Sequence, residues 1–205
     1  MRVCREQRAD YLTGLVLAGG SSRRMGRDKA FLELDGRPLI QIVVERMQSV
    51  CAEVLIVSGD REPYTALGVS VIEDHFPDVG VLAGLHAGLY AASYELSLAV
   101  GCDMPFIKPV LLQAFAAWAV DHDVALLRRG EHVEPLHAAY RRTCVPAMER
   151  AIRAGKRRIV SFFPDVRVRY VTPQDVKPFD AHLTAFRNVN TPQDWQAIKE
   201  VWSEN

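Results

Sequence analysis

The sequence predicts a three-layer α/β/α fold around a mostly parallel β-sheet. Short apolar runs alternate along the chain with stretches of helical apolar spacing, which is the pattern of α/β proteins. Several of the apolar runs end in polar or glycine-rich residues. The 205 residues are enough for one domain with a full core. No linker divides them, so we expect a single domain over 14–205, preceded by a flexible extension over 1–13.

The first half of the chain supplies four of the expected strands and two helices. The strands are expected at 15–18, 54–57, 69–72 and 98–100, with a short extended piece at 31–34. A helix is expected to begin at Pro38, because Leu39, Val43 and Met47 recur at helical spacing. The segment 80–93 begins with glycine and is rich in small residues, so it predicts a loop that leads into a tightly packed helix.

The second half continues the same alternation. Strands are expected at 124–127, 136–140, 166–171 and 186–189. Apolar spacing predicts a helix over 109–120, and a second helix over 146–154 is closed by Gly155. Thr191 is expected to cap a C-terminal helix, with Pro192 at its first position and Asp194 in its first turn.

Composition and charge exclude several classes of protein. The chain is 49% hydrophobic and 24% charged, and 25 basic residues balance 25 acidic ones, so no nucleic-acid or membrane partner is expected. No apolar run is long enough to span a membrane, and residues 1–13 lack the apolar core of a signal peptide. The four widely spaced cysteines favour neither a disulfide framework nor a zinc site, and they fit a cytoplasmic protein.

The segment 128–169 is locally basic, because its arginines and lysines far outnumber its acidic residues. Such a segment suits an anionic small molecule or an acidic partner surface. A solvated arginine-rich face is the competing interpretation.

The segment 14–29, GLVLAGGSSRRMGRDK, is the most informative stretch of the sequence. A buried strand ends in Gly19-Gly20, where the backbone can approach a phosphate closely, and Arg24 and Lys29 add positive charge. The pattern is neither a dinucleotide fingerprint nor a Walker A loop. Taken alone, it also fits a solvated surface turn.

Polar residues follow other expected strands as well, and parallel strands bring such ends to one edge of a sheet, where ligands bind. Asp103 comes directly after the strand at 98–100 and can hold Mg²⁺, a cation that prefers oxygen ligands beside phosphates. Lys29 can meet phosphate oxygens, Asp74 can accept hydrogen bonds from a base or ribose, and Asn190 can add a weaker metal ligand. Turn, capping and solvated roles are the alternatives for these four residues.

Patterns of nucleophilic or zinc-dependent catalysis do not occur in the sequence. The histidines form no H-x-x-x-H or H-E-x-x-H pattern, and no serine lies in G-x-S-x-G. Covalent catalysis is therefore not expected.

The loop LAGGSSRRMGRDK resembles the opening loop of nucleotidyltransferases, and its AGG form resembles that of the molybdenum cofactor guanylyltransferases, the MobA family. Further similar segments are ELDGRPL at 33–39, VIED at 71–74, GVLAG at 80–84, CDMPFI at 102–107, RRI at 157–159 and NVNTP at 188–192. Val81 stands where the family has a proline. The resemblance covers most of the chain from Gly14 to Trp202.

The resemblance implies a Rossmann-like nucleotidyltransferase fold and a Mg²⁺-dependent transfer of GMP from GTP to molybdopterin-bound molybdenum, with release of pyrophosphate. It implies Lys29, Asp103 and Arg24 as catalytic residues. The implied nucleotide-binding residues are Leu17, Ala18, Gly19, Gly20, Lys29, Ser58, Asp74, Gly84 and Asp103. The basic residues Lys156, Arg157 and Arg158 are the candidates for binding the anionic pterin. Transient contact with cofactor-synthesis or acceptor enzymes is a further expectation.

Two rival functions stay open on the sequence. One is the same chemistry with another nucleotide or acceptor, in a cytidylyltransferase for the same cofactor or a sugar-phosphate nucleotidyltransferase. The AGG motif favours guanine, because the cytidylyltransferases usually have AAG there. The other is a nucleotide-binding regulatory or adaptor protein without turnover, and the presence of Lys29 and Asp103 speaks against it.

Overall fold

The computed structural model describes residues 11–18, 29–73, 76 and 79–203. The strands are β1 Leu12–Leu17, β2 Glu33–Leu34, β3 Arg37–Pro38, β4 Glu53–Val57, β5 Ser70–Ile72, β6 Leu96–Gly101, β7 Val124–Arg129, β8 His132–Arg141 and β9 Val168–Val171. The α-helices are α1 Leu39–Gln48, α2 Val81–Ala91, α3 Pro109–Trp118, α4 Val145–Arg153, α5 Pro173–Val176 and α6 Pro192–Ser203. Among the helices of these residues, none has the length and apolar character that crossing a membrane requires.

Seven strands form the central sheet, in the order β5-β4-β1-β6-β8-β7-β9. The neighbours β5, β4, β1 and β6 are parallel, and β7 is parallel to β9. Only β8 among these seven runs the other way, antiparallel to both β6 and β7. The predicted α/β fold with a mostly parallel sheet is therefore confirmed, and β2 and β3 form a separate hairpin.

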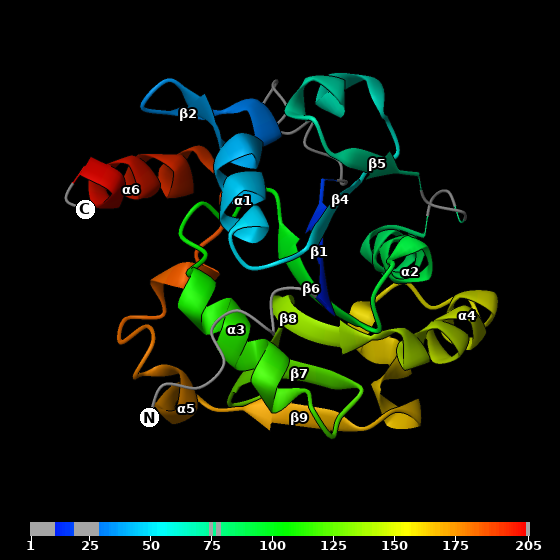
Figure 1. The fold of residues 1–205 in the computed structure, drawn as a ribbon. Coiled ribbons are helices and arrows are strands. Elements are labelled where there is room, and N and C mark those ends of the chain that lie inside the picture. Colours follow the sequence, from blue (N-terminus) through cyan, green and yellow to red (C-terminus); the bar gives the residue numbers. More distant parts are fainter. Residues whose placement is uncertain (1–10, 19–28, 74–75, 77–78, 204–205) are drawn as a thin grey trace.

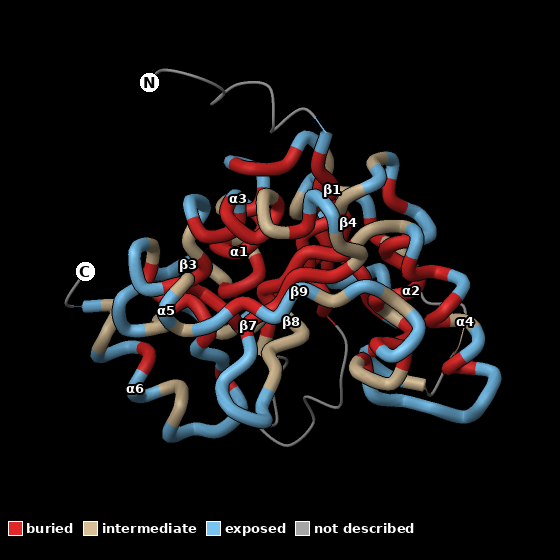
Figure 2. Tube along the Cα trace, turned by 90° about the horizontal axis from the view of Figure 1, so that it is seen from below, coloured by how far each residue is buried: buried red, intermediate tan, exposed pale blue. Residues whose placement is uncertain are grey.

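Helices cover both faces of the sheet (Figure 1). Helices α1 and α3 share one core with sheet residues such as Val16 and Ile56. Helices α2 and α4 share a second core with Leu15 and Leu17. Consecutive residues of β1 therefore point to opposite faces, and each face is apolar because each is covered. In Figure 2 the buried strands form the red interior, while α6 is largely exposed.

The C-terminal helix α6 packs outside the main layers, next to α1 and the β2–β3 hairpin (Figure 1). A small core of Leu34, Leu39, Ile42, Phe106, Val189 and Ile198 joins these elements. The indole Nε1 of Trp202 donates a hydrogen bond to Asp35 Oδ2 at 2.7 Å. The predicted Thr191 cap is confirmed, because Thr191 Oγ1 accepts from Asp194 N at 3.1 Å while Asp194 Oδ2 accepts from Thr191 N.

Three sequence-based boundaries need correction. β1 begins at Leu12, so Leu12 and Thr13 belong to the sheet rather than to the expected extension over 1–13. The extended piece at 31–34 is limited to β2, because residues 29–31 form a 3-10 turn. The strand expected at 186–189 does not form: a 3-10 turn ends at Phe186, and the backbone N–H of Val189 bonds to the Asp103 carbonyl instead of to a neighbouring strand.

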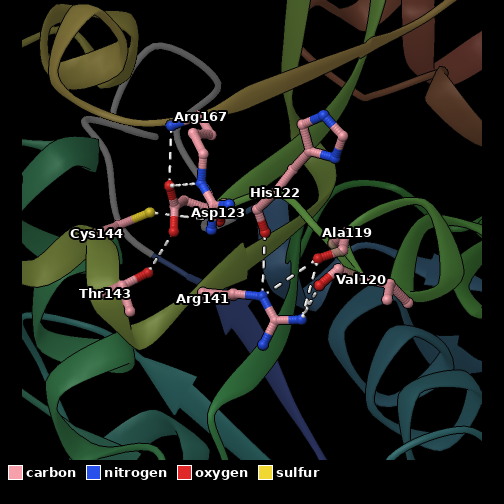
Figure 3. Close-up of polar contacts among 8 residues, drawn as sticks. All are labelled: Ala119, Val120, His122, Asp123, Arg141, Thr143, Cys144 and Arg167. Atoms are coloured by element: carbon pink, nitrogen blue, oxygen red, sulfur yellow. Dashed lines mark hydrogen bonds and ion pairs between the residues drawn. The ribbon is translucent and has the colours of Figure 1, made fainter.

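The amino end of the sheet is held by two charged side chains (Figure 3). Asp123, just before β7, accepts hydrogen bonds from Arg167 N, Arg167 Nε and Thr143 Oγ1. Arg141, at the end of β8, donates to the carbonyls of Ala119, Val120 and His122, which close helix α3. This end lies opposite the carboxyl ends of the parallel strands.

Candidate active site

The carboxyl ends of β1, β4, β5 and β6 lie side by side. Ala18 N donates to Val57 O at 2.9 Å, Ser58 N to Ile72 O at 3.0 Å, and Cys102 N to Leu17 O at 3.1 Å. Pairing therefore continues for one residue beyond β1, β4 and β6, and the segments that follow start from a common edge. This is the edge where open α/β sheets bind ligands.

Asp103 lies two residues beyond β6, and its carboxylate folds back over Gly101. A Cβ atom added to Gly101 would lie only 2.6 Å from Asp103 Oδ1 and 3.6 Å from Leu136 Cδ1. Glycine is therefore required for this position of the carboxylate, because any larger residue would displace it. Asp103 and Leu136 thus lie on the same side of Gly101.

Burial raises the pKa of Asp103, and the positive charge of Lys29 partly offsets this effect. The carboxylate is thus a desolvated acid that gains from a nearby cation. The side chain of Lys29 comes from the 3-10 turn at 29–31, which follows the glycine-rich loop in sequence. The structure therefore places these two predicted residues close enough for their charges to interact.

Asn190 joins them from the far end of the chain. Lys29 Nζ donates a hydrogen bond to Asn190 Oδ1 at 3.0 Å. The preceding residue, Val189, donates its backbone N–H to the Asp103 carbonyl at 3.1 Å. Residues 189–190 therefore contact both Lys29 and the Asp103 segment.

The other described residues of the predicted nucleotide site lie at the ends of β1 and β4 and in the first turn of α2. Leu17 and Ala18 end β1, and Tyr64 donates its hydroxyl to the Ala18 carbonyl at 3.4 Å. Ser58 is buried, and its Oγ accepts from Asp60 N at 3.2 Å. Gly84 lies in the first turn of α2, where its N–H donates to Gly80 O, and an added Cβ would face Val57.

Four predicted site residues lie outside the described residues: Gly19, Gly20, Arg24 and Asp74. Their neighbours in sequence, Ala18, Lys29 and Glu73, all lie in described segments. The roles given to these four residues therefore stay predictions.

A cavity of about 410 Å³ lies between the start of α2, strand β8 and the segment after α4. Its lining is Val81, Glu131, His132, Val133, Pro135, Leu136, Arg157, Arg158, Ile159 and Val160. Leu136 belongs both to this cavity and to the surroundings of Gly101, so the cavity borders the Asp103 segment. Of the three residues predicted to bind a pterin, Arg157 and Arg158 line the cavity, whereas Lys156 is exposed and does not.

The described residues contain no group of three or more histidine, cysteine or acidic side chains that could hold a metal ion. Asp103 therefore offers a single carboxylate. This donor set suits a cation such as Mg²⁺, which takes most of its ligands from water and substrate phosphates.

Sequence reasoning did not identify two residues of this site. In the sequence, Gly101 is the residue after the strand expected at 98–100, and Leu136 is the first residue of the strand expected at 136–140. A glycine two positions before a candidate metal ligand was the only signal for Gly101. The sequence carried no signal for Leu136, because its contact depends on the antiparallel pairing of β8 with β6.

A family model of the MobA-like NTP transferase domain matches residues 14–187. The chain belongs to this family. The match begins inside β1 and ends after the 3-10 turn at Thr184–Phe186, so it includes the central sheet except the first two residues of β1 and stops before Asn190 and α6.

Relatives extend the comparison to the C-terminal part. A probable molybdenum cofactor guanylyltransferase of Pelotomaculum thermopropionicum is 42% identical over 193 residues, which are 94% of each chain. A molybdenum cofactor guanylyltransferase of Desulfosudis oleivorans is 36% identical over 187 residues, 90% of this chain and 93% of the relative.

A solved structure shows the same architecture. The molybdopterin-guanine dinucleotide biosynthesis protein A of Archaeoglobus fulgidus superposes with a TM-score of 0.83 at 30% identity, over 94% of this chain and 100% of that one. The expected nucleotidyltransferase fold is thereby confirmed.

Proposed function

We propose that this protein transfers GMP from GTP to the molybdopterin-bound molybdenum cofactor, with release of pyrophosphate. The observation that carries the proposal is the convergence of Asp103, Lys29 and Asn190 at the carboxyl edge of the sheet, in a chain 42% identical to a probable molybdenum cofactor guanylyltransferase. The product would be the guanine dinucleotide form of the cofactor.

The chemistry is one in-line displacement at phosphorus. An oxygen of the pterin's terminal phosphate attacks the α-phosphorus of GTP and forms the new phosphoanhydride bond. The bond from the α-phosphorus to the oxygen that bridges to the β-phosphate breaks, and pyrophosphate leaves with that electron pair. Such transfers depend on positioning and charge neutralisation rather than on a covalent residue.

Different residues of the chain would bind the phosphates, the nucleoside and the metal ion. Lys29 would bind oxygens of the β- and γ-phosphates and stabilise the departing pyrophosphate. Arg24 and the backbone at Leu17, Ala18, Gly19 and Gly20 would surround the phosphates, while Ser58, Asp74 and Gly84 would contact the nucleoside. Asp103 would hold Mg²⁺. When bound, this ion would neutralise charge on the phosphates.

The cavity beside Leu136 is our proposed binding site for the pterin. Its apolar residues, including Val81, Val133 and Ile159, suit a flat ring system, and Arg157 and Arg158 suit its phosphate. Because the cavity borders the Asp103 segment, a ligand bound there would present its phosphate close to the metal site.

Guanine is favoured over cytosine by the relatives, several of which are named as guanylyltransferases. The deciding measurement is thermal stability with GTP, CTP, ATP or UTP, each with and without MgCl₂. A ligand at a hundredfold excess over its dissociation constant adds about 2.7 kcal/mol to the free energy of unfolding. We expect this gain with GTP and Mg²⁺, followed by pyrophosphate release when molybdopterin is added.

A gain with CTP alone would change the product to the cytosine dinucleotide. Stabilisation by GTP without any pyrophosphate release would instead favour the regulatory or adaptor function.

The pterin site has its own test. Charge reversal in an Arg157→Glu, Arg158→Glu double variant should raise the KM for the pterin at least tenfold and leave the Kd for GTP unchanged. Arg128→Glu is the matched control, because Arg128 lies in the same basic segment but stacks on Tyr170 outside the cavity. An unchanged KM in the double variant would remove the pterin from this cavity.

A further inference from the structure

We propose that Asn190 is a positioning residue that orients the ammonium group of Lys29, and that helix α6 is the element that holds Asn190 in place. The proposal rests on the proposed function, because it assigns a role to Lys29 in phosphate binding. It differs from the metal-ligand role that the sequence suggested for Asn190.

The first observation is the hydrogen bond itself. Lys29 Nζ donates to Asn190 Oδ1 at 3.0 Å, across 161 positions of the chain. Lysine has a long, flexible side chain whose ordering costs conformational entropy. An acceptor that already holds the ammonium group lowers the entropy cost that remains when a phosphate binds.

The second observation is that Asn190 is held at its backbone. Asp194 Oδ2 accepts hydrogen bonds from Asn190 N at 3.0 Å and from Thr191 N at 2.8 Å. On the other side, Val189 is fully buried, and its N–H bonds to the Asp103 carbonyl. The asparagine therefore sits between an anchored helix cap and the Asp103 segment.

The third observation concerns α6 as a support. Ile198 on this helix is buried against Leu34, Leu39 and Ile42, and Trp202 bonds to Asp35. These partners belong to the β2–β3 hairpin, its turn and α1, which follow Lys29 directly in sequence. Packing of α6 thus ties the Asn190 cap to the same substructure that carries Lys29.

The chemistry of the amide fits positioning better than metal binding. Asparagine is a neutral acceptor, so it can orient the ammonium without neutralising its charge, and that charge stays available for phosphate oxygens. A metal ion would need the same oxygen atom that Lys29 uses. A variant that lacks the amide therefore separates the two roles: the loss should depend on Lys29 if Asn190 positions the ammonium, and on the MgCl₂ concentration if Asn190 binds the metal.

The test is a double-mutant cycle with Asn190→Ala and Lys29→Met. In the cycle, kcat for pyrophosphate release and Kd for GTP with Mg²⁺ are measured, together with the melting temperature of each variant. We expect Asn190→Ala to lower kcat about tenfold or more, as small misplacements of reacting groups do. In the Lys29→Met background the same change should have almost no further effect.

Asn190→Asp separates orientation from charge. It keeps an oxygen beside Lys29 but adds a negative charge that neutralises the ammonium, so it should weaken GTP binding although the contact with Lys29 is kept. Gln193→Ala is the matched control, since Gln193 is an exposed residue in the first turn of the same helix. It should leave kcat and Kd unchanged.

The outcomes are distinct. Equal losses from Asn190→Ala with and without Lys29 would overturn the proposal, as would a kcat that recovers fully at high MgCl₂. In both cases wild-type binding of GTP would preserve the proposed function. If the wild-type protein binds no GTP with Mg²⁺, both proposals fail together.

Discussion

At the scale of single residues, the site depends on how closely Asp103 approaches the backbone at Gly101. Asp103 Oδ1 lies only 2.6 Å from the place where any other residue would carry its Cβ. Burial of this carboxylate raises its pKa, so the protein holds a charge there at a cost in stability. Both features are expected where a site is built to receive a cation rather than to stabilise the fold.

Gly101→Ala should reduce turnover by at least tenfold and change stability little. The added Cβ would lie 2.6 Å from Asp103 Oδ1. The carboxylate is the end of a mobile side chain, so it can move away cheaply, but it then leaves its working position. Steady-state kinetics and urea unfolding of the same preparation check this, and a normal kcat would show that the position of the carboxylate is unimportant.

Asp103→Asn should lower turnover by orders of magnitude while raising the stability of the protein without nucleotide or metal. The raised pKa means that the charged carboxylate disfavours the folded state. This penalty is absent below the pKa of the unfolded aspartate and complete above the folded one. Urea unfolding at pH 7.5 with EDTA measures the gain. A loss of stability there would contradict the direction of the pKa shift.

At the scale of elements, the two ends of the sheet have different tasks. The carboxyl ends of β1, β4, β5 and β6 lead to the predicted site residues, whereas charged residues at the opposite end hold strands and helices together. Burial disfavours the charged form of Asp123, but hydrogen bonds from Arg167 and Thr143 and the charge of Arg167 outweigh it and lower its pKa. This carboxylate links the starts of β7 and β9 to the segment after β8 (Figure 3).

Arg141→Met should destabilise the fold by about 1 to 3 kcal/mol, because the carbonyls at the end of α3 lose a charged donor. Arg141 donates to Ala119, Val120 and His122, with distances of 2.7–3.2 Å. Methionine keeps much of the apolar stem. Denaturant unfolding measures the loss, while kcat per folded molecule should not change.

Arg150→Met is the matched control. Its pair with Asp165 is exposed on both sides, and such pairs contribute at most about 1 kcal/mol. Equal effects of the two substitutions would show that the cap on α3 adds no stability of its own.

At the scale of the whole molecule, the protonation of one buried histidine links the stability of the core to pH. His137 lies in β8 with a positive φ of 65°, next to Leu136 of the cavity. Its ring is fully buried beside Phe115 and Phe186, and its Nδ1 lies 3.3 Å from Ala185 O. Burial lowers its pKa to about 4, although the Ala185 carbonyl and the nearby Asp180 act in the opposite direction.

The protein should lose stability as the pH falls from 6.5 towards 4. In this range the unfolded chain binds a proton at His137 and the folded chain does not, so acid favours unfolding. The difference between the ordinary pKa of 6.5 and the folded-state pKa of about 4 corresponds to about 3 kcal/mol in the free energy of unfolding. His137→Asn removes this titration and tolerates positive φ. The difference in unfolding free energy between wild type and variant should therefore be smaller at pH 4.5 than at pH 7.5. A difference that stays constant from pH 7.5 to 4.5 would contradict this role of His137.

Most of the fold could be predicted from the sequence because the strands and the helices of the layers differ in the spacing of their apolar residues. Apolar runs such as 54–57 and 98–100 mark strands covered on both faces, and the Thr191 cap marks the start of α6. The segment at 186–189 was predicted wrongly because its apolar residues are buried without strand pairing: Phe186 packs beside Phe115 of α3 and His137 of β8, and Val189 packs with Ile198 of α6. Local spacing does not distinguish such packing from a strand.

By itself, the sequence determined the fold class, the edge of the sheet where the parallel strands end and the charged residues at that edge. It could do so because the alternation of strand and helix patterns, the glycine turns and the charges are local properties. Only the tertiary structure decided which of them meet. The bond from Lys29 to Asn190 and the position of Leu136 beside Gly101 join segments that lie far apart in the sequence. Their distances follow from strand order and from the packing of α6, which no local pattern contains.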